Sequence, residues 1–387
     1  MIYQEPNLTN EDKAVLELIA DQRKKLALAT QHNPRRWTGS IRRRTFAKAI
    51  QGSNSIEGYN ASLDEAIAVV EEEPIDERTE TWMALSGYRA ALTYIMQAAK
   101  DPDFEFNKQL LKSLHFIMIG YDMSKNPGQW RPGGISVISS RNNEVVYTAP
   151  DREQVEPLIR ELCDYIEADP RQNRLVKAAM VHLNLTLIHP FSDGNGRMAR
   201  AMQTFILALD GLIHPVFSSI EEWLGAFTDD YYNVLAEVAE GHWTPQNSAE
   251  AWVRFCLRGH YEQAATLLRR MEEYELLFAE IQKIMATRKL NERMGMPLFD
   301  SALGTSLNNP RYQEDAEVTP YIAQRDLRQL SDLGLLEPQG ETKARRYMPG
   351  KELVEARRKV RISRPMRDPY DVVRERSEAL EKGPALL

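Results

Sequence analysis

The chain has 387 residues, of which 43% are hydrophobic, and a formal net charge of −7. This length and composition are typical of roughly two to three domains that each bury a core. The acidic balance argues against a protein that coats nucleic acid with its whole surface. The two cysteines, Cys163 and Cys256, exclude a disulfide framework. With no signal-peptide pattern at the start and no apolar run of about eighteen residues, we expect a cytoplasmic protein without a membrane span.

Helical periodicity dominates the first third of the chain. The predicted helices cover residues 9–31, 40–58, 62–73, 78–99 and 107–120. Within the second of them, Ser53 and Glu57 are four residues apart and share one face. Gly58 is suited to end that helix in the left-handed conformation. Taken alone, a glutamate at such a place is ordinarily a surface residue.

The pattern changes to alternation near residue 135. Segments 135–139 and 144–148 alternate roughly between apolar and polar residues, with a turn at 140–143, which predicts a β-hairpin among helices. Helices resume over 150–168, 174–188 and 197–209. The last two carry long apolar stripes, so we expect both to be central and buried.

Further helices are predicted over 220–239 and 248–285, and a separate small domain follows them. A helix over 318–334, an apolar pair, a loop at 337–342 and a strand at 346–348 occur in the order typical of a winged helix-turn-helix. Between residues 341 and 365 there are nine Lys or Arg against three Glu, which suits contacts to phosphate. DNA binding and protein interaction both remain open for this domain. We expect the charged tail after Pro365 to fray.

The stretch from His189 to Arg200 joins the two buried helices and concentrates chemically active side chains. Gly194 and Gly196 allow backbone amides to form an anion-binding nest, to which the start of the next helix adds its dipole. Arg197 and Arg200 are three residues apart and can lie on one helical face. Each of these residues alone could be a cap or a surface charge, but together they favour a site for phosphates.

The sequence of residues 189–200, His-Pro-Phe-Ser-Asp-Gly-Asn-Gly-Arg-Met-Ala-Arg, resembles the motif of the Fic family at every defining position. Fic-like features extend over about residues 105–258 and include Gly128, Arg131, Tyr147, Pro150, Tyr231, Tyr232 and Trp252. The resemblance implies an all-α fold, mainly helical with a small β-hairpin flap, followed by a small winged-helix α+β domain. The implied divisions are an N-terminal helical region 1–104, with an inhibitory helix near 41–58, a Fic catalytic core 105–258, a helical connector 259–295, a winged helix-turn-helix domain 296–365 and a tail 366–387.

The resemblance also implies a protein adenylyltransferase, which moves AMP from ATP to a Ser, Thr or Tyr hydroxyl of a target protein, the chain itself included. It makes His189 the general base, a role that suits an imidazole, and Asp193 the ligand of Mg²⁺, which prefers carboxylate oxygens. The implied nucleotide and phosphate ligands are Gly194, Asn195, Gly196, Arg197, Arg200, Tyr231 and Tyr232. In the family the hairpin adds a target segment as an extra strand, and we assign Val137 and Ile138 to that edge.

Ser53, Glu57 and Gly58 fit the family's inhibitory-helix motif and precede the catalytic motif, as in the class with an N-terminal inhibitory helix. The resemblance implies that Glu57 pairs with Arg200 and holds ATP in a non-productive pose. Two other functions stay open: a hydrolase that removes AMP with the same site, and a DNA-binding regulator that acts through the winged helix. A homodimer of the Fic type also stays open.

Overall fold

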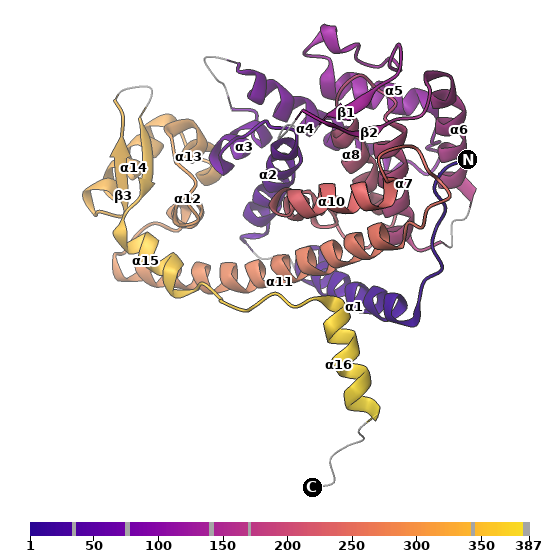
Figure 1. The fold of residues 1–387 in the computed structure, drawn as a ribbon. Coiled ribbons are helices and arrows are strands. Elements are labelled where there is room, and N and C mark those ends of the chain that lie inside the picture. The colour runs from indigo at the N-terminus through magenta and orange to yellow at the C-terminus, as the bar shows by residue number, and fades with distance from the viewer. Residues whose placement is uncertain (33–35, 74–77, 139–142, 169–171, 342–344, 382–387) are drawn as a thin grey trace. The chain divides into compact units, whose positions relative to one another are not determined.

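The computed structural model describes residues 1–32, 36–73, 78–138, 143–168, 172–341 and 345–381. The described chain divides into two compact units (Figure 1), a first of residues 1–34, 42–265 and 366–387 and a second of residues 35–41 and 266–365. The domain limits inferred from the sequence stay a proposal. Parts of the predicted loop before residue 40, of the hairpin turn, of the wing loop and of the tail lie outside the described residues.

The first unit is mainly helical, as predicted. It contains α1 (Asn10–Ala27), η1 (Leu28–His32), α3 (Leu63–Val70), α4 (Glu80–Ala98), α5 (Lys108–Ile119), η2 (Met123–Lys125), α6 (Arg152–Ala168), α7 (Arg174–Ile188), α8 (Asn195–Ala208), η3 (Pro215–Phe217), α9 (Glu221–Ala226), α10 (Thr228–Ala239) and α16 (Pro369–Glu381). Helices α2 (Thr38–Ile56) and α11 (Glu250–Thr287) have residues in both units. No helix in the described ranges is long and apolar enough to cross a membrane.

Helices α7 and α8 form the centre of the first unit. Every residue of α7 except Arg174 and Thr186 is buried, and so is every residue of α8 except Gly196. The apolar stripes predicted for these two helices are therefore confirmed as core. The six residues that join them, 189–194, are called the motif loop below. Because both flanking helices are enclosed, the motif loop is held from both ends.

The predicted β-hairpin is present and is fixed to α7. Strand β1 (Ser136–Ile138) pairs antiparallel with β2 (Val145–Thr148), with an irregularity between Val137 and Ile138. The buried Tyr147 hydroxyl donates a 2.6 Å hydrogen bond to the carbonyl oxygen of Leu187, near the end of α7. Arg131 donates to the carbonyl oxygens of His189 and Pro150. These bonds place the hairpin beside the motif loop.

Two sequence predictions are wrong in this unit. The single helix predicted over 220–239 is two helices, because the backbone leaves helical geometry at Phe227 (φ −116°, ψ 41°). The tail predicted to fray instead forms α16, which packs on α1. Val372 and Val373 are buried there, and the Tyr370 hydroxyl donates a 3.0 Å hydrogen bond to Asp12 Oδ1. Burial of Val372 and Val373 stabilises α16, although the charged composition of the tail had led us to expect fraying.

The second unit contains a helical cluster and a two-stranded sheet. Its elements are η4 (Glu292–Met294), α12 (Gly295–Ala302), α13 (Asn309–Ala316), α14 (Pro320–Asp332), β3 (Leu336–Gln339), β4 (Arg346–Pro349) and α15 (Lys351–Lys359). Strands β3 and β4 pair antiparallel after α14. A buried carboxylate, Asp326, ties the cluster together, since it accepts two hydrogen bonds from Arg293 and one from Tyr312. The winged helix-turn-helix assignment and its binding to DNA stay predictions.

Helix α2, which carries Ser53, crosses α9 at a contact of two glycines. A Cβ atom at Gly52 would lie 2.4 Å from the carbonyl oxygen of Glu221, and one at Gly225 would lie 2.7 Å from Cα of Gly52. Backbone therefore meets backbone at this crossing, and only glycine fits without movement. The close approach fixes the position of α2 on the first unit.

We expect Gly52→Ala to lower the free energy of unfolding by about 1–3 kcal/mol, because its methyl group would overlap the Glu221 carbonyl oxygen. Gly39→Ala, in the same helix, is the control: apart from its chain neighbours and the helix backbone, no atom of the described residues lies within 4 Å of its added Cβ, and alanine favours helix by about 0.5–1 kcal/mol. Urea titrations followed by circular dichroism measure both. Equal midpoints for the two variants would contradict the close crossing.

Candidate active site

His189 ends α7 in the left-handed conformation, with φ 51° and ψ 57°. Non-glycine residues rarely adopt it, so the surrounding contacts must hold the turn. The ring Nδ1 lies 3.0 Å from the carbonyl oxygen of Thr186. Since a carbonyl oxygen only accepts, Nδ1 carries the proton of the neutral ring and Nε2 keeps a free lone pair. Burial lowers the pKa of His189, opposed by Thr186 and Glu57, which favours this neutral form at physiological pH.

The motif loop is shaped by Asn195 and His115. The Asn195 carboxamide accepts from the Phe191 amide and donates to the Phe191 carbonyl oxygen, both at 2.9 Å. His115 stacks flat on the Phe191 ring at 3.8 Å, and its Nε2 donates to the carbonyl oxygen of Asp193. The His115 ring is fully buried. Asn195 is thus engaged within the loop, and any part of its side chain in binding phosphate stays a prediction.

Arg197 and Arg200 are both buried on α8, but their partners differ. Among the described residues, none of the three Arg197 guanidinium nitrogens has a hydrogen-bond partner. Its contacts are the Tyr59 ring, 5.1 Å away, and Asp193 Oδ2 at 3.7 Å. Arg200, in contrast, donates to Ser53 Oγ, to the Ser53 carbonyl oxygen and to Glu57 Oε1, at 2.8, 2.9 and 2.6 Å. A buried guanidinium without acceptors is costly unless an anion binds it.

The end of α2 places Glu57 on Arg200. Gly58 has φ +87°; its amide donates to Ser55, and the Tyr59 amide donates to Asn54. These two bonds are those of a Schellman motif, in which Glu57 is the last half-helical residue. A carboxylate at a helix C-terminus is disfavoured by the helix dipole. The ion pair with Arg200 therefore offsets an unfavourable position, and the sequence-predicted contact between Glu57 and Arg200 is present.

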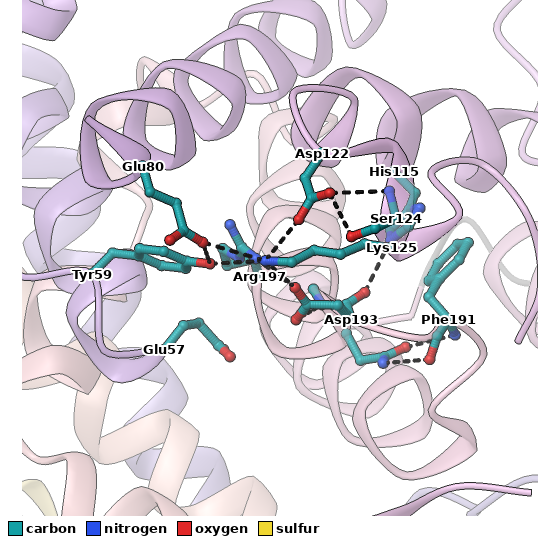
Figure 2. A network of polar contacts seen from close by, with 12 residues as sticks. Glu57, Tyr59, Glu80, His115, Asp122, Ser124, Lys125, Phe191, Asp193 and Arg197 are labelled. Carbon is teal, nitrogen blue, oxygen red and sulfur yellow. Dashed lines mark hydrogen bonds and ion pairs between the residues drawn. The ribbon is translucent and has the colours of Figure 1, made fainter. Parts of the chain in front are cut away.

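Asp193 is the carboxylate of the motif loop. Its Oδ1 accepts from the Gly194 amide at 2.6 Å, and its Oδ2 lies 3.0 Å from the Lys125 ammonium (Figure 2). Hydrogen bonds and positive neighbours lower the pKa of Asp193, although burial opposes them. In the described ranges, no group of three or more His, Cys, Asp or Glu side chains could enclose a metal. One carboxylate still fits Mg²⁺ that is shared with substrate phosphates.

Part of the chain is similar to a known family. Residues 105–207 match the Fic/DOC family. Over these residues the chain is similar to that family. The match contains α7, the motif loop and nearly all of α8, which are the elements that carry His189, Asp193 and the two arginines.

Curated relatives share modest identity. The protein adenylyltransferase Fic of Nematostella vectensis is 25% identical over 262 residues, which cover 65% of this chain and 55% of that protein. A protein adenylyltransferase of Caenorhabditis briggsae is 25% identical over 225 residues, 56% of this chain and 41% of that protein. The chain thus spans about half the length of these relatives. A Fic family protein of Desulfovibrio desulfuricans shares the fold, with a TM-score of 0.58, 20% identity and coverage of 90% of this chain and 99% of that one.

The remaining predicted site residues are Tyr231, Tyr232, Val137 and Ile138. The buried Tyr231 ring lies 6.0 Å from the Arg200 guanidinium carbon. The Tyr232 hydroxyl donates to the carbonyl oxygen of Ile56, at the end of α2. Val137 and Ile138 lie on β1, with 59% of Ile138 exposed. Roles for these four residues in binding nucleotide or target stay predictions.

Sequence reasoning missed three residues around this site: Tyr59, Lys125 and Glu221. Tyr59 and Lys125 contact the motif residues directly, but no sequence motif marks them, because they come from separate segments. Glu221 is fully buried on α9, where its Oε1 accepts hydrogen bonds from Tyr88 and Thr204. Burial raises the pKa of Glu221 to about 7, although both hydroxyls and Arg200 oppose the shift.

We expect the contribution of Glu221 to the free energy of unfolding to fall as the pH rises from 4.5 to about 7. Below its ordinary pKa of 4.5 the carboxyl is protonated in folded and unfolded chains alike; between 4.5 and about 7 the folded chain holds the extra proton. Stability therefore decreases across that window and is level above it. Relative to the unaltered chain, Glu221→Gln should gain stability from pH 4.5 to pH 8, by at most about 3 kcal/mol.

Urea titrations at pH 4.5, 6 and 8 measure this difference. Glu17→Gln, which removes an exposed carboxylate from α1, is the control and should change little with pH. A constant stability difference between Glu221→Gln and the unaltered chain at all three pH values would show that Glu221 does not titrate in this window.

Proposed function

We propose that this chain is a protein adenylyltransferase, which transfers AMP from ATP to a Ser, Thr or Tyr hydroxyl of a target protein. The observation that carries the proposal is the buried Arg197 guanidinium, which lacks a hydrogen-bond partner among the described residues and follows the motif loop. A polyanion would supply the missing acceptors. The names of the curated relatives support AMP as the transferred group.

In the proposed reaction, His189 acts through its free Nε2. This nitrogen takes the proton from the target hydroxyl as the hydroxyl oxygen bonds to the α-phosphorus of ATP. The bond from the α-phosphorus to the bridging oxygen breaks, and pyrophosphate leaves with that oxygen. Arg197 and Arg200 bind the departing phosphates and stabilise their charge. The target keeps AMP as a phosphodiester, so atoms and charges balance.

Asp193 is the proposed protein ligand of Mg²⁺, with the remaining ligands supplied by phosphate and water. When bound, the ion supplies positive charge beside the leaving pyrophosphate. Asp193 suits this task because its carboxylate is ionised and fixed by the Gly194 amide. The motif loop backbone therefore orients the ligand before ATP arrives.

We further propose that Glu57 restrains the enzyme. The carboxylate occupies a guanidinium nitrogen of Arg200 that a phosphate would otherwise bind. It also fills the space next to Gly196, since a Cβ there would lie 2.3 Å from Glu57 Oε1. With Glu57 in place, the phosphates of ATP cannot reach Arg200. ATP would then bind in a pose that does not align its α-phosphorus with the attacking hydroxyl.

Target recognition is proposed to use the edge of β1. Val137 and Ile138 lie on this strand, and β2 pairs with its other side. An extended target segment could add to β1 through backbone hydrogen bonds, which tolerate many side chains. Such pairing would hold the target hydroxyl beside the motif loop, because Tyr147 and Arg131 fix the hairpin there.

Glu57→Gly should raise self-modification by ATP labelled at the α-phosphate, because Arg200 becomes free for phosphate. The rise should be about tenfold or more, as expected when a charged hydrogen bond at a partly buried site is removed. His189→Ala in the Glu57→Gly chain should lower the labelling by about 10²–10⁴-fold through loss of the general base. Autoradiography and mass spectrometry for one added AMP measure both.

Glu11→Gly, on α1, is the control for loss of a glutamate and should label like the unaltered chain. Equal labelling of Glu57→Gly and the unaltered chain would contradict the restraint. Undiminished labelling of the double variant would contradict the role of His189.

A second candidate is removal of AMP, favoured by the charge of Glu57 acting on His189, since a carboxylate near the base could orient water. To distinguish AMP transfer from AMP removal, AMP-modified Glu57→Gly chain is mixed with the unaltered chain and the released AMP is measured. Release of AMP that requires Glu57 would favour the hydrolase.

A further inference from the structure

Lys125 is a resident cation at the motif loop. It is the last residue of η2, in the segment after α5. Its ammonium nitrogen lies 3.0 Å from Asp193 Oδ2 and donates a 3.1 Å hydrogen bond to the Tyr59 hydroxyl. Only 22% of the side chain is exposed. Figure 2 shows the ammonium between the Tyr59 and Asp193 side chains. Lys125 therefore contacts Oδ2 of Asp193, the carboxylate that is proposed to bind the metal ion.

Further acceptors hold the ammonium in this place. Glu80 Oε1 lies 3.6 Å and Asp122 Oδ2 3.8 Å from the Lys125 nitrogen. The Lys125 ammonium and the Asp193 carboxylate carry opposite charges, and their 3.0 Å contact is a charge-assisted hydrogen bond.

This contact is incompatible with metal on the same oxygen. Mg²⁺ binds carboxylate oxygens at about 2.0–2.1 Å and requires nearly octahedral geometry. Asp193 Oδ1 already accepts from the Gly194 amide, and Oδ2 is contacted by Lys125 and lies 3.7 Å from Arg197. A divalent cation on Oδ2 would share that oxygen with an ammonium of the same sign, so one of them must leave.

Tyr59 connects Lys125 to the end of α2. Its hydroxyl donates to Glu80 Oε1 and accepts from Lys125, and its ring faces the Arg197 guanidinium at 5.1 Å. Tyr59 follows Gly58 in the same Schellman motif that places Glu57 on Arg200. One short segment therefore contacts Arg200 through Glu57, and both Arg197 and Lys125 through Tyr59.

We propose that Lys125, held by Tyr59, is an internal competitor of the metal ion at Asp193 and forms a second restraint besides Glu57. This inference rests on the proposed function, because it concerns metal loading of the same site. Glu57 blocks a phosphate position, whereas Lys125 blocks a metal position. Removal of Glu57 frees Arg200 but leaves the ammonium on Asp193. Full loading of the site therefore requires that Lys125 leave Asp193.

The test measures metal binding rather than turnover. Mn²⁺ is titrated into Glu57→Gly chain saturated with the non-hydrolysable analogue α,β-methylene-ATP, and free Mn²⁺ is followed by electron paramagnetic resonance. Lys125→Met in this background keeps the length of the side chain and removes its charge. Lys125→Met should lower the Mn²⁺ concentration at the binding midpoint by about tenfold, because one charged hydrogen bond to Asp193 no longer competes with the metal. Tyr59→Phe, which removes the acceptor hydroxyl, should lower it less.

Lys112→Met is the matched control. Its ammonium lies 4.9 Å from the Trp130 ring, so its loss removes one charge outside the Asp193 contacts and should leave the midpoint unchanged. Asp193→Asn should abolish the tight Mn²⁺ site whether or not Lys125 is present. An unchanged or higher midpoint for Lys125→Met would overturn the inference. Failure of Glu57→Gly to bind the nucleotide analogue, measured by calorimetry without metal, would instead contradict the proposed function.

Discussion

The buried Arg200 guanidinium is the constraint on which the site depends. A fixed positive charge inside a helical core needs acceptors, because its desolvation is costly. Ser53 supplies two and Glu57 one, all from the end of α2. The pairing draws α2 against α8, and the glycine crossing with α9 allows this close approach. The residue proposed to bind phosphate thus also determines how α2 packs on α8.

Buried guanidinium nitrogens beside the motif loop lack hydrogen-bond acceptors among the described residues. Arg197 lacks a hydrogen-bond partner among the described residues, one nitrogen of Arg200 is also unsatisfied, and Lys125 lies on the Asp193 carboxylate. The His189 backbone is held in the left-handed region. The unsatisfied guanidinium nitrogens and the left-handed backbone of His189 destabilise the chain without ligand, and the enclosed helices α7 and α8 offset this cost. Preorganised guanidinium donors without acceptors are suited to bind the oxygens of a triphosphate.

Much of this arrangement could be predicted from the sequence, because local patterns determine it. The span of α7, the hairpin and the contact between Glu57 and Arg200 follow from periodicity or from a family motif. The contact of Lys125 with Asp193 could not be predicted, since it joins segments 68 residues apart without a motif. The break at Phe227 and the order of α16 depend on tertiary packing, which outweighs local propensity. Asn195 belongs to the motif, yet the structure was needed to show its bonds to Phe191.

The contacts of Arg200 differ in how easily a ligand could replace them. Ser53 is fully buried in the body of α2, and one of its contacts is a backbone carbonyl oxygen, so it leaves only if the helix moves. The Glu57 side chain is 23% exposed and lies beyond the last full turn, where the Schellman motif and the ion pair with Arg200 position it. Because the glycine crossing holds α2 in place, rotation of the Glu57 side chain is the smallest change that releases Arg200. Ser53 would then keep the guanidinium oriented while a phosphate takes the place of the carboxylate.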